Sequence, residues 1–296
     1  MQPQPYTTPE LMMQIELGAA IAISISGGKD SQALLSSVLS WYRANNLTNQ
    51  IFAIHADLGR AEWAQTEQFV QDLCESHQIQ LVVVSAMHNG KKIDLLDKIE
   101  IRQEQLKKSG RLNVPIYPSM MQRYCTSDLK TDPINAYFKQ QEFPKIISVE
   151  GIRWDESKAR SQKLVFQRRD GMKRGAVRGF TWNAIAHFKE ADVLKACGMS
   201  EAEFKLGQWQ YKATETIPSN WKIHPAYAMG NTRLSCAICV LASKNDFLNG
   251  IKHNPQLADW ISQKEEETGF TYQQGISIKQ GRARLAAQLE QTMISF

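Results

Sequence analysis

The segment over residues 21–31 constrains the fold of this 296-residue chain more than any other stretch. It reads Ile-Ala-Ile-Ser-Ile-Ser-Gly-Gly-Lys-Asp-Ser, which predicts a short apolar strand, a tight glycine turn and the start of a helix. Gly27 and Gly28 carry no Cβ, so the backbone can turn sharply and approach a ligand closely. The first N–H groups of the helix have no intrahelical partner, and the helix dipole adds partial positive charge there. We therefore expect this segment to bind phosphate or pyrophosphate.

Polar side chains of the same segment could complete such a site. Ser26 and Ser31 offer hydroxyl donors, Lys29 offers a positive charge, and Asp30 offers a carboxylate that could bind Mg²⁺. The alternative is an ordinary strand–turn–helix whose glycines only satisfy the backbone geometry. The loop is not of the G-x-x-x-x-G-K-[ST] type.

The composition excludes several classes of protein. A hydrophobic fraction of 43% with 22% charged residues indicates a globular chain rather than a disordered one. The net charge of +5 permits a nucleic-acid partner without requiring one. No apolar run is long enough to cross a bilayer, and the first residues lack the features of a secretory signal, so we expect a cytoplasmic protein. In a reducing compartment, the five cysteines favour metal binding or catalysis over disulfides.

Apolar strands alternate with helices through the first half of the chain. Strands are predicted over residues 20–26, 51–57, 79–84 and 145–150, with helices over 31–45, 62–77 and 94–108. This pattern predicts an α/β fold with a doubly wound, mostly parallel sheet covered by helices on both faces. We expect an N-terminal helix over 1–18, a nucleotide-binding α/β domain over 19–180 and a mostly helical region with loops over 181–296.

Three of the predicted strands are followed directly by glycine and charged residues. Ligands of such folds bind beyond the carboxyl ends of the strands, so these residues should converge on one site. They are Gly27 and Gly28, Asp57 and Gly59, and Gly151 and Arg153. An Asp-x-Gly string is also typical of a turn. For the last strand end we favour a phosphate contact by Arg153 and a structural ion pair between Glu156 and Arg160, which are spaced i,i+4.

The cysteines differ in what their surroundings predict. Cys236 and Cys239 form a Cys-x-x-Cys pair, whose spacing lets two thiolates reach one metal or cluster, and Cys125 is a third candidate. Cys74 lies in an amphipathic helix and is expected in the core. Cys197 precedes a glycine at a helix end, which favours a structural role over a ligand.

The densest basic run covers residues 168–174, Arg-Arg-Asp-Gly-Met-Lys-Arg, with Arg178 shortly after it. Such runs are often solvated surface. The alternative is contact with the phosphate backbone of a polymer substrate. Few aromatic residues accompany the run, which argues against a stacking platform for single strands.

Four strings together resemble one protein family. The Ser-Gly-Gly-Lys-Asp-Ser loop is similar to the PP-loop of the N-type ATP pyrophosphatases, the superfamily that includes the phosphoadenosine-phosphosulfate (PAPS) reductases. The other strings resemble PAPS reductase motifs in the same order: Arg123-Tyr124-Cys125-Thr126 with Leu129, Lys130 and Pro133; Trp182-Asn183 with Asp192-Val193; and His224-Pro225-Ala226-Tyr227 with Gly230, Arg233, Cys236 and Cys239. The resemblance runs over about residues 21–239 and implies an adenine nucleotide alpha hydrolase-like fold of the HUP type.

The chain departs from the assimilatory reductases in its cysteines. Those reductases carry a catalytic cysteine near the C-terminus, whereas no cysteine follows Cys239 here, so the expected nucleophile is missing. The middle motif has the single Cys125 where cluster-bearing reductases have two adjacent cysteines. The chain most resembles the DNA-phosphorothioation ATP pyrophosphatases of the Dnd and Ssp systems, with Cys-Thr-x-x-Leu-Lys as the closest shared string.

That resemblance implies an enzyme that cleaves ATP to AMP and pyrophosphate in the presence of Mg²⁺ and adenylates a substrate for sulfur insertion. It implies a DNA backbone phosphate as the substrate. Partners would be a cysteine desulfurase and other phosphorothioation proteins. A PP-loop tRNA thiolase and a PAPS reductase-like sulfonucleotide-binding protein are the alternatives.

The resemblance also assigns roles to single residues. Catalytic roles fall to Lys29, Asp30, Ser31, Lys130 and Arg153. The nucleotide would contact Ser26, Gly27, Gly28, Asp30, Ser31, Asp57, Gly59, Gly151 and Arg153. A [4Fe–4S] cluster, or zinc as the alternative, would be held by Cys125, Cys236 and Cys239, with Cys197 as a conceivable fourth ligand.

Overall fold

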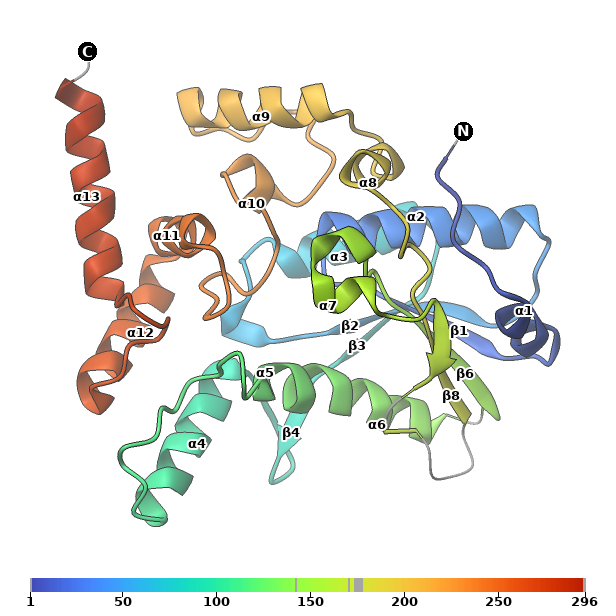
Figure 1. The fold of residues 1–296 in the computed structure, drawn as a ribbon, viewed down its shortest axis with the longest axis horizontal. Coiled ribbons are helices and arrows are strands. Elements are labelled where there is room, and N and C mark those ends of the chain that lie inside the picture. Colours follow the sequence, from blue (N-terminus) through green and yellow to red (C-terminus); the bar gives the residue numbers. More distant parts are fainter. Residues whose placement is uncertain (1, 142, 170, 173–177, 295–296) are drawn as a thin grey trace.

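The centre of the molecule is a six-stranded sheet in the order β3-β2-β1-β6-β8-β7 (Figure 1). The computed structural model describes residues 2–141, 143–169, 171–172 and 178–294. Five strands are parallel: β1 (Ala20–Ser24), β2 (Ile51–Ala56), β3 (Leu81–Val84), β6 (Lys145–Val149) and β8 (Arg178–Trp182). The edge strand β7 (Phe166–Arg168) runs antiparallel to β8. The predicted fold class, a doubly wound and mostly parallel α/β sheet, is confirmed.

The central strands are apolar throughout because helices cover both faces of the sheet. In β1, Ile21 and Ile23 pack on one face with α2 (Lys29–Ala44), α3 (Thr66–Ser76) and α8 (Glu190–Ala196). Ala20 and Ala22 point to the other face, where Phe138 of α6 (Asp132–Gln140) packs. Burial on both sides explains why the strand reads as a continuous apolar run rather than an alternating one.

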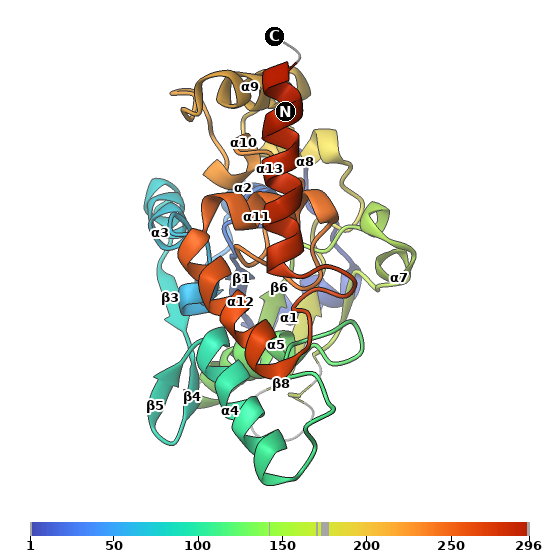
Figure 2. The same ribbon diagram turned by 90° about the vertical axis from the view of Figure 1, so that its left-hand side faces the viewer.

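A second hydrophobic core lies beside the carboxyl end of the sheet. It joins α4 (Leu95–Lys108) to three C-terminal helices, α11 (Lys244–His253), α12 (Pro255–Thr268) and α13 (Ile278–Ile294). Figures 1 and 2 show α11 and α12 packed together and α13 rising from them away from the sheet. Leu129 and Ile238 also belong to this core, so it holds the segments that carry Cys125 and the Cys-x-x-Cys pair.

The remaining elements are short, apart from α9. They are α1 (Pro9–Glu16), η1 (Gly59–Ala61), β4 (Ala86–His88), β5 (Lys91–Ile93), α5 (Tyr124–Thr126), η2 (Ser127–Thr131), η3 (Trp154–Glu156), α7 (Lys158–Ser161), α9 (Glu201–Thr214) and α10 (Pro225–Ala228). None of the described helices has both the length and the apolar character needed to cross a membrane.

The structure differs from the sequence-based expectations mainly in its short strands. The β4–β5 hairpin and the strands β7 and β8 were not predicted, and β8 ends inside the region expected to be mostly helical. Three of these strands have only three residues, too few to show a period of two. The helix expected from residue 62 begins at Thr66, because η1 and a turn come first.

Candidate active site

The glycine loop closes on itself through the Ser31 hydroxyl. Ser31 Oγ donates to the carbonyl of Gly28 at 2.8 Å and accepts the N–H of Ser26 at 3.2 Å. Gly27 has a φ of +77°, in the left-handed region that favours glycine. Gly28 is the N-cap of α2 and has no side chain to cap the helix. The loop therefore holds its shape by internal contacts, and the first N–H groups of α2 are not capped by Gly28.

A cavity of about 420 Å³ lies at the carboxyl ends of β1, β2 and β6. It brings together seven residues that the sequence assigned to the site: Ser26, Gly28, Asp30, Ser31, Lys130, Gly151 and Cys236. The glycine loop, the middle motif and the Cys-x-x-Cys segment thus meet around one space, although they are about 100 residues apart in the chain. Of the other predicted residues, Gly27, Lys29, Asp57, Gly59, Arg153, Cys125 and Cys239 are not among those that line it.

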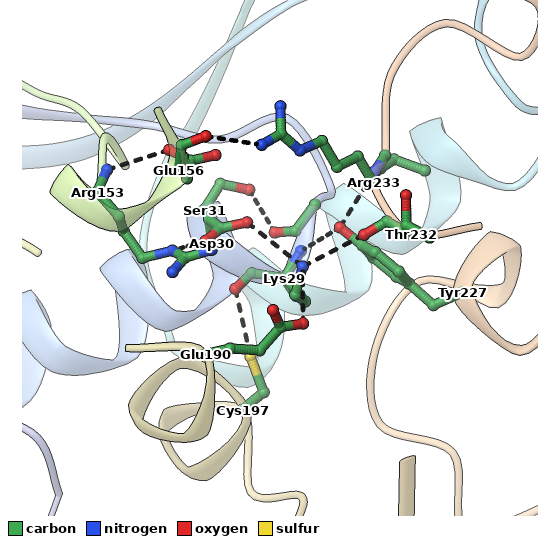
Figure 3. Close-up of polar contacts among 12 residues, drawn as sticks. Lys29, Asp30, Ser31, Arg153, Glu156, Glu190, Cys197, Tyr227, Thr232 and Arg233 are labelled. Atoms are coloured by element: carbon green, nitrogen blue, oxygen red, sulfur yellow. Dashed lines mark hydrogen bonds and ion pairs between the residues drawn. The ribbon is translucent and has the colours of Figure 1, made fainter. Parts of the chain in front are cut away.

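Basic side chains also line this cavity. The Lys130 side chain makes no hydrogen bond or ion pair with the residues that the structure describes, whereas Arg160 pairs with Glu156 as its i,i+4 spacing predicted. Arg233 donates to the Glu156 carbonyl at 3.4 Å (Figure 3). Burial and the nearby charge of Arg233 lower the pKa of Arg160. These crowded cations favour an anionic ligand.

Arg169 is one of the cavity residues that sequence reasoning missed. It belongs to the basic run, yet its side chain is buried and bonds Glu150 at 2.6 Å and Asn135 at 2.7 Å. Arg168 and Arg178 are exposed, in line with the surface interpretation. The other charged residues of the run, Asp170, Lys173 and Arg174, lie outside the described residues. A basic run carries no period that would single out one buried member.

Asp30 and Arg153, to which separate roles were assigned, bind each other. Arg153 Nε lies 2.5 Å from Asp30 Oδ1 (Figure 3). Arg153 Nη1 lies 2.5 Å from Asp155 Oδ1. Burial alone would lower the pKa of Arg153, but the charges of Asp30 and Asp155 raise it, so the guanidinium stays charged. Gly151 lies close to the start of α2, because a Cβ there would be 3.3 Å from the backbone carbonyl oxygen of Asp30.

Lys29 and Tyr227 connect the loop to the segment before the Cys-x-x-Cys pair. The Tyr227 hydroxyl accepts the N–H of Lys29 at 3.1 Å and that of Leu234 at 3.2 Å. Burial raises the pKa of Tyr227, so it remains a neutral phenol. The ammonium of Lys29 turns toward Glu190 and the Thr232 carbonyl rather than into the cavity (Figure 3). The sequence placed Tyr227 in a motif without indicating this role.

Asp57 and Gly59 form a turn. Asp57 Oδ1 accepts the N–H of Gly59 at 2.6 Å, and its other oxygen pairs with Lys92 at 2.6 Å. Burial raises the pKa of Asp57, but the hydrogen bonds from Lys92 and Gly59 more than offset it, so the pKa is lowered. Gly59 has a φ of +59°, and a Cβ there would lie 2.6 Å from Asp94 Cβ. These contacts give Asp57 and Gly59 structural roles, which explain why an aspartate and a glycine occur at these positions.

Their neighbours His55 and Glu62 do line the cavity. His55 Nδ1 lies 2.9 Å from the Ile25 carbonyl, and Nε2 lies 3.4 Å from Glu62 Oε2. Burial lowers the pKa of His55, but the hydrogen bond and charge of Glu62 outweigh it and the pKa is raised. The pair places a carboxylate and an imidazole on the loop side of the cavity. Neither was singled out as a site residue, because a lone His and Glu form no recognisable motif.

The thiols lie near one another without forming a metal site. Burial first, and then the charges of Cys239 and Cys125, raise the pKa of Cys236, the thiol that lines the cavity. Among the described residues, no three His, Cys, Asp or Glu side chains are arranged to hold a metal ion. The predicted [4Fe–4S] or zinc site at these three cysteines is thus not formed in this structure. Cys197 instead donates to the Lys29 carbonyl at 3.3 Å, at the start of α2.

The parallel α/β sheet and the glycine loop at the start of α2 define an adenine-nucleotide-binding type of fold. The chain belongs to the phosphoadenosine phosphosulfate reductase domain family, whose model matches residues 20–242. This span runs from β1 to just past the Cys-x-x-Cys pair, and α11, α12 and α13 lie beyond it. Membership implies adenine nucleotide and sulfur chemistry. A comparison with curated proteins finds no match.

Proposed function

We propose that the chain is an ATP pyrophosphatase that adenylates a DNA backbone phosphate for sulfur insertion, as in the Dnd and Ssp phosphorothioation systems. One observation carries the proposal: a single cavity joins the glycine loop to Lys130 and to Cys236. A site for activating a phosphate and a thiol segment therefore face the same space. A cavity of about 420 Å³ is large enough for a nucleotide.

In the proposed reaction, an oxygen of the acceptor phosphate attacks the α-phosphorus of ATP. A new P–O bond forms, the bond to the bridging α–β oxygen breaks, and that oxygen leaves with the electron pair as pyrophosphate. Lys130 and Arg233 are the basic residues best placed to stabilise the developing charge, because both line the cavity and neither forms an ion pair with a carboxylate of the described residues. Backbone N–H groups at Gly28 and Ser31 would orient the phosphates.

Asp30 would hold Mg²⁺, which when bound neutralises charge on the leaving pyrophosphate. Arg153 holds the Asp30 carboxylate in place through its contact at 2.5 Å. Asp30 would then keep one oxygen for the ion while the other stays with the guanidinium. The three cysteines do not form a metal site among the described residues, and the proposed reaction does not depend on a cluster. We propose instead that a cysteine desulfurase supplies the sulfur and that other phosphorothioation proteins choose the DNA sequence.

The family match favours one alternative, a protein that binds a sulfonucleotide. The two functions differ in which bond is broken, since a sulfonucleotide protein would not split ATP between its α- and β-phosphates. The test is to incubate the full chain with [α-³²P]ATP, Mg²⁺ and a DNA duplex. AMP transfer to DNA with equal release of pyrophosphate supports the proposal. Turnover of a sulfonucleotide with no reaction of ATP would replace it by the alternative.

A cellular measurement separates DNA from RNA as the acceptor. Nuclease digestion and mass spectrometry of host DNA should detect phosphorothioate linkages only when this chain and its partners are expressed. The matched control is the Ser31→Ala variant, which lacks the hydroxyl that closes the loop. Thiolated tRNA bases with unmodified DNA would show instead that the chain is a tRNA thiolase.

A further inference from the structure

The ion pairs around the main cavity, the one of about 420 Å³ beside the glycine loop, leave two of its cations without a carboxylate. Lys130 and Arg233 line this cavity, and neither forms an ion pair with a described residue. The four carboxylates of the lining all have other basic partners: Asp30 has Arg153, Glu62 has His55, Glu150 has Arg169 and Glu156 has Arg160. The charges of Lys130 and Arg233 are therefore available to an anion.

A second cavity, of about 390 Å³, shows the opposite situation. It is lined by Lys29 and Arg153, which do not line the main cavity. There each cation already has a carboxylate, since Arg153 Nε lies 2.5 Å from Asp30 and Lys29 Nζ lies 3.5 Å from Glu190. The unpaired positive charge thus lies on the side of the main cavity.

Positive charge also extends from the main cavity onto the surface, through Arg123. This arginine is exposed and does not line the cavity, and in the described part of the chain its guanidinium donates only to the Met120 sulfur, a weak acceptor. Burial and the charge of Arg233 lower the pKa of Arg160, and the nearby charge of Arg123 lowers it further. We call Arg123, Lys130, Arg160 and Arg233 the cationic rim.

The cationic rim is assembled by the tertiary structure from three separate segments. Arg123 and Lys130 flank the short helix α5, Arg160 belongs to α7, and Arg233 follows α10. Arg233 donates to the Glu156 carbonyl at 3.4 Å, which connects the last of these segments to the second (Figure 3). Like charges brought together in this way repel one another, so a ligand with several negative charges would stabilise the arrangement.

The extent of the rim indicates the size of that ligand. A nucleotide inside the cavity could contact Lys130 and Arg233, but Arg123 lies outside the cavity lining. A ligand that contacts the whole rim must continue from the cavity over the surface, as a nucleic-acid backbone with its regular phosphates would. The aromatic side chain that lines the cavity, Tyr227, is only 1% exposed and offers no ring face for an unpaired base. These features favour a duplex, whose bases stay stacked inside.

The basic run over residues 168–174, which the sequence offered as a polymer contact, is less suited to this role. Arg178, shortly after the run, is the first residue of β8 and lies in register with Lys145, the first residue of β6. Both residues are therefore at the amino end of the parallel sheet, whereas the cavity is at its carboxyl end. Arg169 does reach the cavity, but it is buried and paired with Glu150.

We propose that the cationic rim binds the backbone of a DNA duplex. Arg123 and Arg160 hold phosphates next to the acceptor, while Lys130 and Arg233 hold the acceptor phosphate at the cavity. This role of the rim rests on the proposed function, which takes DNA as the substrate. Contacts to phosphates position a duplex without reading its bases, so the choice of sequence is left to partner proteins.

Fluorescence anisotropy of a labelled DNA duplex, titrated with the full chain at several NaCl concentrations, tests this proposal. Arg123→Ala should weaken binding about tenfold at low salt, because a hydrogen bond to a charged group is lost. It should also reduce the slope of log K against log[NaCl] by about 1, the value for one phosphate contact. Arg123→Lys should keep the slope. The control, Arg178→Ala, removes an exposed arginine at the other end of the sheet and should change neither quantity.

A double variant extends the same measurement. Adding Arg160→Gln to Arg123→Ala should lower the slope by about 1 again. Unchanged slopes in both proteins, an equal loss in Arg178→Ala, or tighter binding of tRNA than of duplex DNA would overturn the proposal. Incubation of the wild-type chain with [α-³²P]ATP and the duplex separates the two levels of failure. Adenylated DNA with unchanged slopes would contradict only the role of the rim, whereas a wild-type chain that neither binds nor adenylates DNA would contradict the proposed function itself.

Discussion

The two sides of the main cavity are built in different ways. The loop side consists of residues at the ends of β1, β2 and β6, which rest on the apolar sheet. The thiol side consists of Lys130 and Cys236 with Cys125 and Cys239 nearby, and it rests on the second core of α4, α11 and α12. The loop side depends on a local strand–turn–helix pattern. The thiol side depends on packing between segments more than 100 residues apart, and α11 and α12 lie outside the family match.

The electrostatics of the two sides differ as well. On the loop side the charges are already paired, as Arg153 is with Asp30 and His55 is with Glu62. On the thiol side Lys130 lacks a partner among the described residues, and burial raises the pKa of Cys236 so that its thiol stays protonated. The loop side is thus arranged before a ligand binds, whereas the thiol side would need an anion beside Lys130 to balance its charge. Four variants test this difference between the two sides.

The largest effect is expected from the loop itself. Ser31→Ala removes the hydroxyl that links Gly28 and Ser26, so the N–H groups lose their alignment with the phosphates. Pyrophosphate release from ATP should fall about 100- to 1,000-fold, by analogy with the loss of one oxyanion donor. A steady-state pyrophosphate assay measures it, with Ser40→Ala on the same helix as the control. Normal turnover of Ser31→Ala would show that the loop is only structural.

His224, whose Nε2 lies 3.2 Å from the Thr66 hydroxyl, predicts a pH dependence of stability. Burial lowers the pKa of His224 to about 4, against about 6.5 in an unfolded chain. The unfolded state therefore binds more protons between these values, and stability falls by up to about 3 kcal/mol as the pH drops from 6.5 to 4. Urea unfolding at several pH values measures this slope.

The variant His224→Gln should flatten that slope, while His88→Gln, at an exposed site, should leave it unchanged. Equal slopes in all three proteins would mean that His224 is not held neutral in the folded state.

The next effect tests the thiol side. In α11, a Cβ on Gly250 would overlap with the backbone carbonyl of Ala237, inside the Cys-x-x-Cys pair. Gly250→Ala should destabilise the fold by about 1–3 kcal/mol and increase the reactivity of the thiols toward a disulfide reagent. Gly281→Ala is the matched control, since the nearest atoms to its Cβ belong to side chains rather than to the backbone, with Ile251 Cδ1 the closest, at 2.5 Å. Similar behaviour of both variants would argue against tight packing of the thiol segment by α11.

The smallest effect is expected at Cys197, a thiol that belongs to the loop side. Its contact with the Lys29 carbonyl places it at the start of α2, and burial raises its pKa. Cys197→Ala should lower the free energy of unfolding by about 1 kcal/mol, through the loss of one weak hydrogen bond and some packing. Iron, sulfide and zinc content after anaerobic purification should equal that of the wild type. Loss of metal from the Cys197→Ala protein would show that Cys197 is a metal ligand.

Sequence reasoning predicted the parallel sheet and the loop because both follow from local patterns. The apolar run predicted the strand β1 and the two glycines predicted the turn after it, and the structure contains both. Arg160 and Glu156 pair as their spacing predicted. The strand β7 and the burial of Arg169 were not predictable, because a three-residue strand has no measurable period and a basic run does not reveal which guanidinium finds a buried carboxylate.

The sequence alone determined that this protein has a parallel α/β sheet with a phosphate-binding loop, because strand apolarity and glycine conformations act over a few residues. The tertiary structure decided which cavity each charged side chain borders. Lys29 and Arg153 turned out to border a different cavity from Lys130. Cys197 was separated from the other candidate thiols by its place at the end of α8, against the start of α2. Each of these outcomes depends on which distant carboxylate or carbonyl comes within a few ångströms of the side chain, and the fold sets that distance.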